Sequence, residues 1–229
     1  MKHVWAGLAA GLMGCATPTG AGGASFTKAD LDASLDARIA AEDRGDGPGA
    51  TAAGDALSRR MEPWAVFISD MSGFSKLTRE KGIAWFLSQI RRMERVALPL
   101  LARHQVELVK QYGDDLFIVS KDPARLVAFA RDFLAALEAE RAKGHPLRVS
   151  IGIASGEVLR VGADLFGEPV NRASKLGEDL GEPGELLLGV EVFEALGPAA
   201  GTGCVLEPEG TRGAKFPFAR CGEAPEAAR

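Results

Sequence analysis

From residue 64 onward, short apolar runs alternate with long amphipathic stretches, and this alternation is what most constrains the fold. The run at residues 65–69 ends at Asp70 and a glycine turn, which is typical of a central strand with a carboxylate at its exit. A long helix is predicted next, because apolar residues recur at helical spacing on one face while the other face is charged. Its apolar positions are Ile83, Phe86, Leu87, Ile90, Met93, Ala97 and Leu100.

The remainder of this region repeats the two patterns. Strand-like runs at residues 106–109 and 116–119, separated by a turn at 111–115, predict a hairpin. Asp122 followed by Pro123 predicts the N-cap and first turn of a second long helix. Later elements are expected as strands at 148–153, at 157–161 after a turn at Gly156, and at 185–188, with short helices at 171–180 and 191–196. This order predicts an α+β fold with a mostly antiparallel sheet covered by helices.

The start of the chain has a different character. Lys2 precedes an apolar run at residues 4–14, and the letters LMGC at 12–15 resemble a bacterial lipobox. The run is too short for a membrane span, which needs roughly 20 apolar residues. We therefore expect residues 1–16 to be a signal or lipobox segment, with a lipid anchor at Cys15 as the sole link to a membrane. The alternative is that the folded part simply opens at Met61, after a poorly ordered extension.

Residues 17–60 are dominated by Ala, Gly, Asp and Ser, and predict a flexible linker with a break at 47–50 and no core of its own. One weak helix is expected after Thr27, with apolar residues at Leu31, Leu35 and Ile39. We expect residues 61–222 to form the folded domain and 223–229 a tail.

Composition and charge exclude several function classes. Lys and Arg number 27 against 31 Asp and Glu, a net charge of −4, which argues against a nucleic-acid-binding protein. The three cysteines form no CxxC pair and the three histidines lie far apart, so a zinc site is not expected. The chain also has no GxxxxGK[ST], GxGxxG or GxSxG motif, the common nucleotide-binding and hydrolase signatures.

Asp70 and Asp114 are the strongest candidates for chemistry. Asp70 follows a buried strand and Asp114 lies in the turn of the next hairpin. Two carboxylates at neighbouring strand ends repel each other and lose hydration unless a cation lies between them. Oxygen ligands without histidine suit Mg²⁺ or Mn²⁺. The competing interpretation is structural: Asp114 and Asp115 favour a tight turn, and Asp70 caps the following helix.

Lys110 and Asp164 are a second candidate pair. An ammonium group in a strand needs an acceptor, and Asp164 is a lone acid ahead of an apolar turn. Together they offer one donor and one acceptor, which is what the amino and ring-nitrogen edge of adenine requires. Each residue alone is equally well explained as a solvated surface charge.

Four blocks of sequence, in this order and spacing, resemble class III adenylate and guanylate cyclases. The blocks are FISDMSGF at 67–74, KQYGD at 110–114, RVSIG at 148–152 and DLFGEPVNRASK at 164–175. The resemblance runs from about residue 64 to about residue 221 and includes EPGELLL at 182–188. It implies the ferredoxin-like, palm-type fold of that family.

The resemblance also implies a role for each matching residue. Asp70 and Asp114 would bind two Mg²⁺ or Mn²⁺ ions, Arg148 the triphosphate, Lys110 and Asp164 the adenine edge, and Asn171 the ribose. The implied reaction is attack of the ATP 3′-hydroxyl on the α-phosphorus, giving 3′,5′-cyclic AMP and pyrophosphate. Sites of this family form between two domains, so one chain holding both residue sets implies a homodimer with ATP as its other partner.

Lys175 departs from the family pattern, which usually has arginine four residues after the asparagine. Lysine keeps the charge but loses the bidentate fork of arginine. We therefore expect a slowed rather than an inactive enzyme, with Asn171 and Lys175 as its catalytic side chains.

Two other interpretations remain at this stage. One is an idle cyclase-like binding or scaffold module, exported as a lipoprotein, in which Cys204 and Cys221 could pair as a disulfide. The other is a polymerase palm, because YGDD at 112–115 resembles the metal-binding turn of RNA-directed polymerases, but the chain is too short for fingers and thumb. A catalytic domain that faces the cytoplasm is favoured, because ATP is the substrate that the resemblance implies.

Overall fold

The computed structural model describes residues 26–71, 74–200 and 203–222, so the expected lipobox at Cys15 and the tail at 223–229 lie outside the described residues. Within these residues, eight strands form one sheet in the order β2-β3-β1-β4-β6-β8-β7, and β5 pairs with β4 away from this path. β4 and β6 are parallel, and the other pairs of the described sheet are antiparallel. The predicted α+β fold with a mostly antiparallel sheet is confirmed. The strands are β1 (Glu62–Met71), β2 (Glu107–Tyr112), β3 (Asp115–Ser120), β4 (Val149–Val161), β5 (Asp164–Phe166), β6 (Leu186–Gly189), β7 (Cys204–Glu207) and β8 (Phe218–Cys221).

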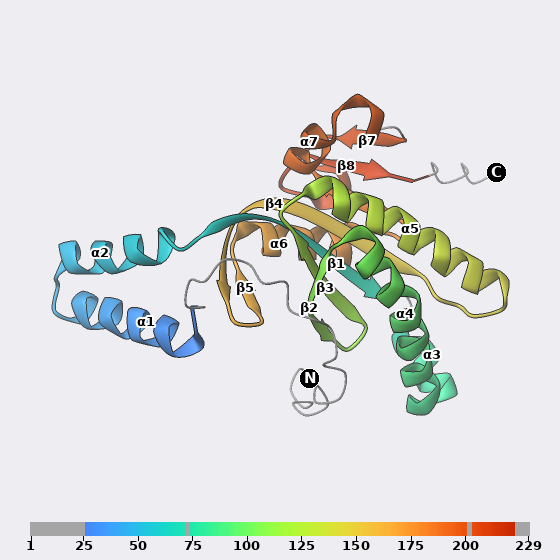
Figure 1. Ribbon diagram of the computed structural model, residues 1–229, viewed down its shortest axis with the longest axis horizontal. Helices are drawn as coiled ribbons and strands as arrows, with labels where there is room; N and C mark the ends of the chain where they lie inside the picture. The colour runs from blue at the N-terminus through green and yellow to red at the C-terminus, as the bar shows by residue number, and fades with distance from the viewer. Residues whose placement is uncertain (1–25, 72–73, 201–202, 223–229) are drawn as a thin grey trace.

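Two long helices cover one face of this sheet (Figure 1). α4 (Ile83–His104) follows the short α3 (Phe74–Lys81), and α5 (Pro123–Ala142) starts at the predicted Asp122 cap, which accepts a hydrogen bond from the Ala124 backbone N–H. Their apolar faces bury the main core against alternate residues of the central strands. This core includes Phe67, Met93, Ala97, Ile118, Phe129, Phe133 and Ile151.

The opposite face carries α6 (Glu168–Ser174), which continues as a π-helical turn, η1 (Lys175–Leu180). These elements lie very close to the strands because glycines meet at the contact. A Cβ on Gly152 would come within 2.1 Å of the Ala173 carbonyl oxygen, and one on Gly177 within 2.8 Å of the Ile68 carbonyl oxygen. The glycines therefore fix where the α6–η1 segment sits relative to the end of β1.

β4 differs from its prediction. The turn expected at Gly156 is absent, since β4 runs without interruption from Val149 to Val161 and Gly156 pairs with Trp64 of β1. Gly156 has a φ of 151°, a conformation that glycine tolerates within a strand, so the residue marks an irregularity rather than a reversal. The reversal comes at residues 162–163, where Gly162 has a φ of 58° and leads into β5.

The prediction that residues 17–60 form a flexible linker is wrong for most of the residues that the structure describes in this range. Two helices, α1 (Lys28–Asp43) and α2 (Gly47–Ser58), form a hairpin at one end of the molecule (Figure 1). A Thr27–Asp30 capping box starts α1, and the Asp46 side chain caps α2 at the supposed break. Leu31, Phe26 and Leu57 pack against the end of β4. The composition of this segment did not indicate that its few apolar residues would be buried there.

The C-terminal part closes the far edge of the sheet. α7 (Val190–Ala200) follows β6, and the short η2 (Thr211–Gly213) precedes β8. Cys204 and Cys221 face each other across β7 and β8 and form a disulfide. None of the helices in the described segments is both long and apolar enough to cross a membrane.

Candidate active site

Asp70 and Asp115 approach each other because of strand pairing. The β1–β3 register runs from Ala65 opposite Ser120 to Ser69 opposite Leu116, so the next step places Asp70 opposite Asp115. Side chains of directly opposed residues point to the same face of an antiparallel pair. Both carboxyls therefore lie on the face of the sheet that carries α6 and η1.

Asp114 completes a cluster of three carboxylates. It follows Gly113, whose φ of 64° suits the first central position of a two-residue hairpin turn, so the turn is tighter than the five residues expected. One oxygen from each of Asp70, Asp114 and Asp115 lies within 4.8 Å of the others. The backbone N–H of Met71 is close enough to the Asp114 carboxylate to lower its pKa, so the hairpin tip lies beside the end of β1.

The electrostatics of this cluster favour a cation. Burial, then the charges of Asp114 and Glu178, raise the pKa of Asp70 to about 6. Burial, then the charges of Asp114, Asp70 and Glu178, raise the pKa of Asp115 to about 7. Burial also raises the pKa of Asp114, although two backbone N–H groups oppose the shift. Among the side chains that the structure describes, no Lys or Arg forms an ion pair with these three acids.

The donor set fits divalent Mg²⁺ or Mn²⁺. It consists of carboxylate oxygens, the ligands these hard ions prefer. The Asp115 Oδ1 atom is buried and has no hydrogen-bond partner among the described residues, and a buried oxygen in that state is costly unless something occupies the space beside it. The residues present therefore fit a divalent metal site.

Lys110 and Asp164 are brought together from different strands. Lys110 lies on β2 and Asp164 opens β5, yet the Lys110 Nζ atom donates a hydrogen bond of 2.7 Å to Asp164 Oδ1. The ammonium also lies 5.1 Å from the centre of the Phe117 ring. These contacts leave a donor, an acceptor and an aromatic surface side by side. The role of Lys110 and Asp164 in base recognition stays a prediction.

Asn171 and Lys175 are one helical turn apart and both are exposed. Asn171 lies on α6, and Lys175 opens η1, where its Nζ atom donates a 2.7 Å hydrogen bond to Asp179. Ser150, opposite Asp70 on β4, donates its hydroxyl to the Gly177 carbonyl and ties η1 to the strand that flanks the acids. The two predicted catalytic side chains thus share one face of the α6–η1 segment.

Arg148 is not joined to the other predicted residues. It is exposed, directly before β4, and its charge lowers the pKa of Glu138 on α5, after the stronger effect of Arg141. No ion pair or hydrogen bond within the described part of the chain connects it to Asp70 or Asp114. Its triphosphate role stays a prediction.

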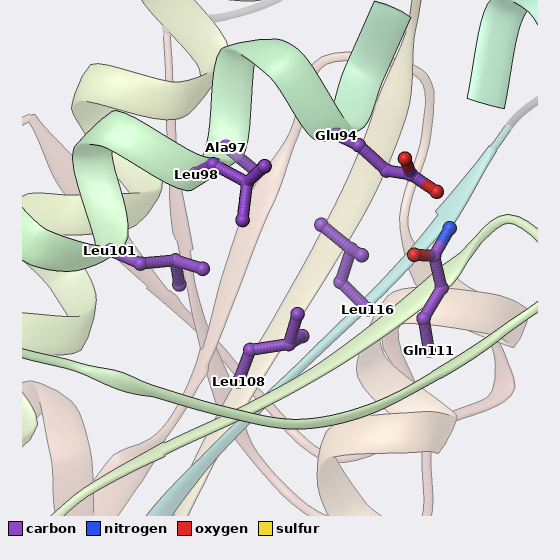
Figure 2. Close-up of a pocket in the computed structure, with 7 residues that line it drawn as sticks. All are labelled: Glu94, Ala97, Leu98, Leu101, Leu108, Gln111 and Leu116. Atoms are coloured by element: carbon purple, nitrogen blue, oxygen red, sulfur yellow. The ribbon is translucent and has the colours of Figure 1, made fainter. Parts of the chain in front are cut away.

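A small apolar cavity of about 20 Å³ lies on the other side of the sheet (Figure 2). It lies between α4 and the β2–β3 hairpin, and Leu116 points into it. Leu116 follows Asp115 directly, so strand alternation puts their side chains on opposite faces. The cavity belongs to the packing beneath α4 and is separate from the acids. Its lining residues are Glu94, Ala97, Leu98, Leu101, Leu108, Gln111 and Leu116.

Sequence reasoning missed Asp115 and Glu178. Asp115 was interpreted as turn chemistry, but it is the first residue of β3 and the turn is formed by Gly113 and Asp114. The available signal was the register: pairing of residues 65–69 with 116–120 already places Asp70 opposite Asp115. Glu178 lies on η1, and its charge acts on Asp70 because η1 packs close to the end of β1. No local sequence pattern indicated this approach.

Known proteins resemble this chain over the same region. The model of the adenylate and guanylate cyclase catalytic domain matches residues 57–210. A pH-sensitive adenylate cyclase of Mycobacterium tuberculosis is 30% identical over 151 residues, which are 66% of this chain and 36% of that protein. An uncharacterized protein of the same organism is 30% identical over 131 residues, 57% of this chain and 34% of that protein. The chain thus spans about a third of the length of these curated relatives.

Solved structures with the same fold have low sequence identity. An adenylate/guanylate cyclase/hydrolase from Silicibacter pomeroyi superposes with a TM-score of 0.61 at 21% identity, covering 70% of this chain and 95% of that one. The adenylyl cyclase CyaB from P. aeruginosa gives a TM-score of 0.57 at 19% identity, with coverages of 73% and 98%.

Proposed function

Because the chain belongs to the adenylate and guanylate cyclase catalytic domain family, we propose that it is an adenylate cyclase that converts ATP to 3′,5′-cyclic AMP and pyrophosphate. Relatives with adenylate cyclase names support this assignment. The single observation that carries the choice of ATP is the contact between Lys110 and Asp164.

This pair selects the base by its hydrogen-bonding pattern. The Lys110 ammonium donates to a ring nitrogen of adenine, and the Asp164 carboxylate accepts from the exocyclic amine. Guanine presents a carbonyl and a ring N–H at the same edge, so the donor and acceptor positions are exchanged. Lys110 and Asp164 therefore favour ATP over GTP.

The carboxylate cluster provides the reaction centre. Two Mg²⁺ or Mn²⁺ ions held by Asp70 and Asp114 would activate the 3′-hydroxyl and neutralise charge on the phosphates. The bond from the 3′-oxygen to the α-phosphorus forms as the bond from that phosphorus to the pyrophosphate oxygen breaks, and the hydroxyl proton leaves to water. No protein nucleophile is needed.

The other predicted residues orient the substrate. Asn171 positions the ribose, Lys175 adds positive charge beside the reacting phosphate, and Arg148 binds the triphosphate. Lys175 is a single ammonium donor paired with Asp179, so we expect weaker stabilisation of the transition state than a guanidinium would give.

We propose that two copies of the chain build each site. Large apolar side chains are exposed beside both halves of the site: Tyr112, 72% exposed, is next to the hairpin turn of Asp114, and Phe166, 47% exposed, lies on the strand of Asp164. Exposed aromatic groups next to functional residues are typical of protein interfaces. A head-to-tail homodimer would cover them and offer the acids of one copy to the base-binding pair of the other.

A complementation experiment tests this arrangement. Asp70→Ala removes a metal ligand and Asp164→Ala removes a base contact, so each variant alone should form little cyclic AMP from ATP. Mixing them, with refolding or coexpression to exchange subunits, should restore about a quarter of the wild-type rate, since half of the dimers hold one intact site of two. A mixture no more active than its components would rule out a shared site, while GTP in place of ATP tests the base assignment separately.

We also place the domain on the cytoplasmic side, where ATP is available. The Cys204–Cys221 disulfide is the observation that favours the exported alternative, because disulfides persist in oxidising compartments. Lipid labelling of Cys15 and thiol counting in whole cells distinguish the two. Free thiols without lipid support a cytoplasmic enzyme, and a lipidated chain with an intact disulfide supports the exported module.

A further inference from the structure

Asp115 is placed to act on the same ligand as Asp70 and Asp114. One oxygen of each residue lies within 4.8 Å of the other two, so the three carboxylates form a single group. The family resemblance assigns only Asp70 and Asp114 to metal binding and leaves Asp115 without a role. The structure therefore contains one acid more than the assigned site uses.

A turn-forming role does not account for Asp115. The central turn residues are Gly113 and Asp114, whereas Asp115 begins β3 and pairs with Tyr112. A turn-forming aspartate accepts backbone N–H groups. The Asp115 carboxyl instead has an oxygen within 4.8 Å of one of Asp70, the residue opposite it in the ladder.

The Asp115 carboxyl has a free acceptor oxygen. Its Oδ1 atom is buried and has no hydrogen-bond partner among the described residues. For Asp114, by comparison, two backbone N–H groups, its own and that of Met71, oppose the rise in pKa that burial causes. Asp115 thus keeps acceptor capacity for a ligand, and its carboxyl lies beside those of Asp70 and Asp114.

We propose that Asp115 is a third carboxylate ligand of the divalent metal site, a role that rests on the proposed cyclase function. Affinity for hard divalent cations rises with the number of charged oxygen ligands. A third carboxylate allows this chain to hold Mn²⁺ or Mg²⁺ before the nucleotide arrives and adds its own phosphate oxygens.

Binding of Mn²⁺ alone to the full chain tests this inference without catalysis. Free Mn²⁺ is counted by electron paramagnetic resonance in the absence of nucleotide, for wild type, Asp115→Asn, Asp114→Asn and Glu178→Gln. Asparagine keeps the shape of Asp115 and removes its charge. Glu178→Gln is the matched control, because Glu178 acts on the cluster through its charge but is not one of the three clustered acids.

A ligand and a nearby charge give different results. If Asp115 is a ligand, Asp115→Asn should weaken Mn²⁺ binding by about tenfold or more, and Asp114→Asn should do the same. Glu178→Gln should cost only about two- to fivefold, the effect of a partly screened charge. Equal losses for Asp115→Asn and Glu178→Gln, or wild-type affinity in Asp115→Asn, would overturn the inference and leave the two-aspartate site intact.

Two further outcomes are decided by the same series. If wild type and all variants fail to bind Mn²⁺ alone, the claim of a site that holds metal before nucleotide is wrong, and cyclic AMP assays with ATP then show whether the proposed function survives. Thermal unfolding without metal checks that each variant folds. If Asp115→Asn does not fold, Asp115→Ser takes its place, because a smaller neutral side chain removes the same ligand.

Discussion

The Lys110 ammonium and the Asp164 carboxylate are joined by a 2.7 Å hydrogen bond although the residues are 54 positions apart in the chain. The bond forms because β5 turns back along β4 and approaches β2, so it depends on the fold rather than on local sequence. An exposed ion pair of this kind contributes little to stability. The contact matters for recognition instead, since it holds a hydrogen-bond donor and an acceptor side by side where a nucleobase could bind.

Substitution of Asp164 should lower the preference for ATP. Asp164→Asn replaces a charged acceptor by a neutral amide, and a hydrogen bond to a charged group is worth about 1.5–3 kcal/mol. We expect kcat/KM for ATP to fall by about 10- to 100-fold and that for GTP to fall less, so the ratio of the two decreases. Steady-state assays with both nucleotides measure it, with Asp36→Asn as a control for an exposed acid on α1. An unchanged ratio would remove Asp164 from base recognition.

Replacement of Lys175 by arginine should raise turnover. Lys175→Arg restores a planar group with several donors at the start of η1, and an arginine can retain its contact with Asp179 while donating to phosphate. Lys175→Ala should lower kcat by about 100-fold, because one preorganised donor is lost. Measurement of kcat at saturating ATP compares the three proteins. A rate for Lys175→Arg at or below that of wild type contradicts this placement.

The metal-free protein should become less stable as pH rises from about 4 to 7. The folded-state pKa values of Asp70 and Asp115 are raised to about 6 and about 7 from an ordinary 3.8, so the folded state holds protons that the unfolded state releases. This contribution is fully present below about pH 4 and is lost as pH passes through those values. Thermal unfolding of wild type and Asp115→Asn shows it as a difference in Tm.

The Tm of Asp115→Asn should rise relative to that of wild type as pH increases. Added Mn²⁺ should restore the stability of the wild-type protein at pH 7.5. Comparison with the variant removes the contributions of acids outside the cluster. A difference in Tm that does not change between pH 4 and 7 would mean that the buried, mutually repelling charges of the cluster do not destabilise the folded protein.

Sequence reasoning was most reliable where a feature depends only on neighbouring residues in the chain. The Asp122 cap and Pro123 start of α5 follow from local rules, and the structure confirms them. The apolar stripe of α4 is confirmed at Ile90, Met93 and Ala97, but its predicted members Ile83 and Leu87 are exposed. Asp70 is singled out because it follows an apolar strand, and Asp114 because it lies in a hairpin turn, and the structure brings their carboxylates together. These features needed no knowledge of distant residues.

Sequence reasoning failed where contacts between residues far apart in the chain decide the structure. Gly156 was expected to reverse the chain, but pairing with Trp64 keeps β4 straight through it. The Ala- and Gly-rich N-terminal segment forms helices because its few apolar residues dock on β4. Asp115 and Glu178 join the site through strand register and the approach of η1, which composition and spacing do not encode.

Gly152→Ala should disturb the site through the backbone. The added Cβ would lie 2.1 Å from the Ala173 carbonyl oxygen and 2.5 Å from the Gly177 nitrogen, so the α6–η1 segment must move. We expect a loss of about 1–3 kcal/mol or more in unfolding free energy and a fall in kcat. Gly47→Ala on α2 is the control, because its Cβ would meet no described atom within 4 Å. Equal stability of the two variants would contradict the close contact.

The central claim is that the aspartates at the ends of β1 and the β2–β3 turn hold divalent metal against ATP. Its most direct test is cyclic AMP formation by the purified full chain with ATP and either Mn²⁺ or Mg²⁺, comparing wild type with Asp70→Ala. We predict metal-dependent cyclic AMP from wild type and a loss of at least about 100-fold in the variant. Equal activity of the two proteins, or no cyclic AMP from wild type with either metal, would contradict the account.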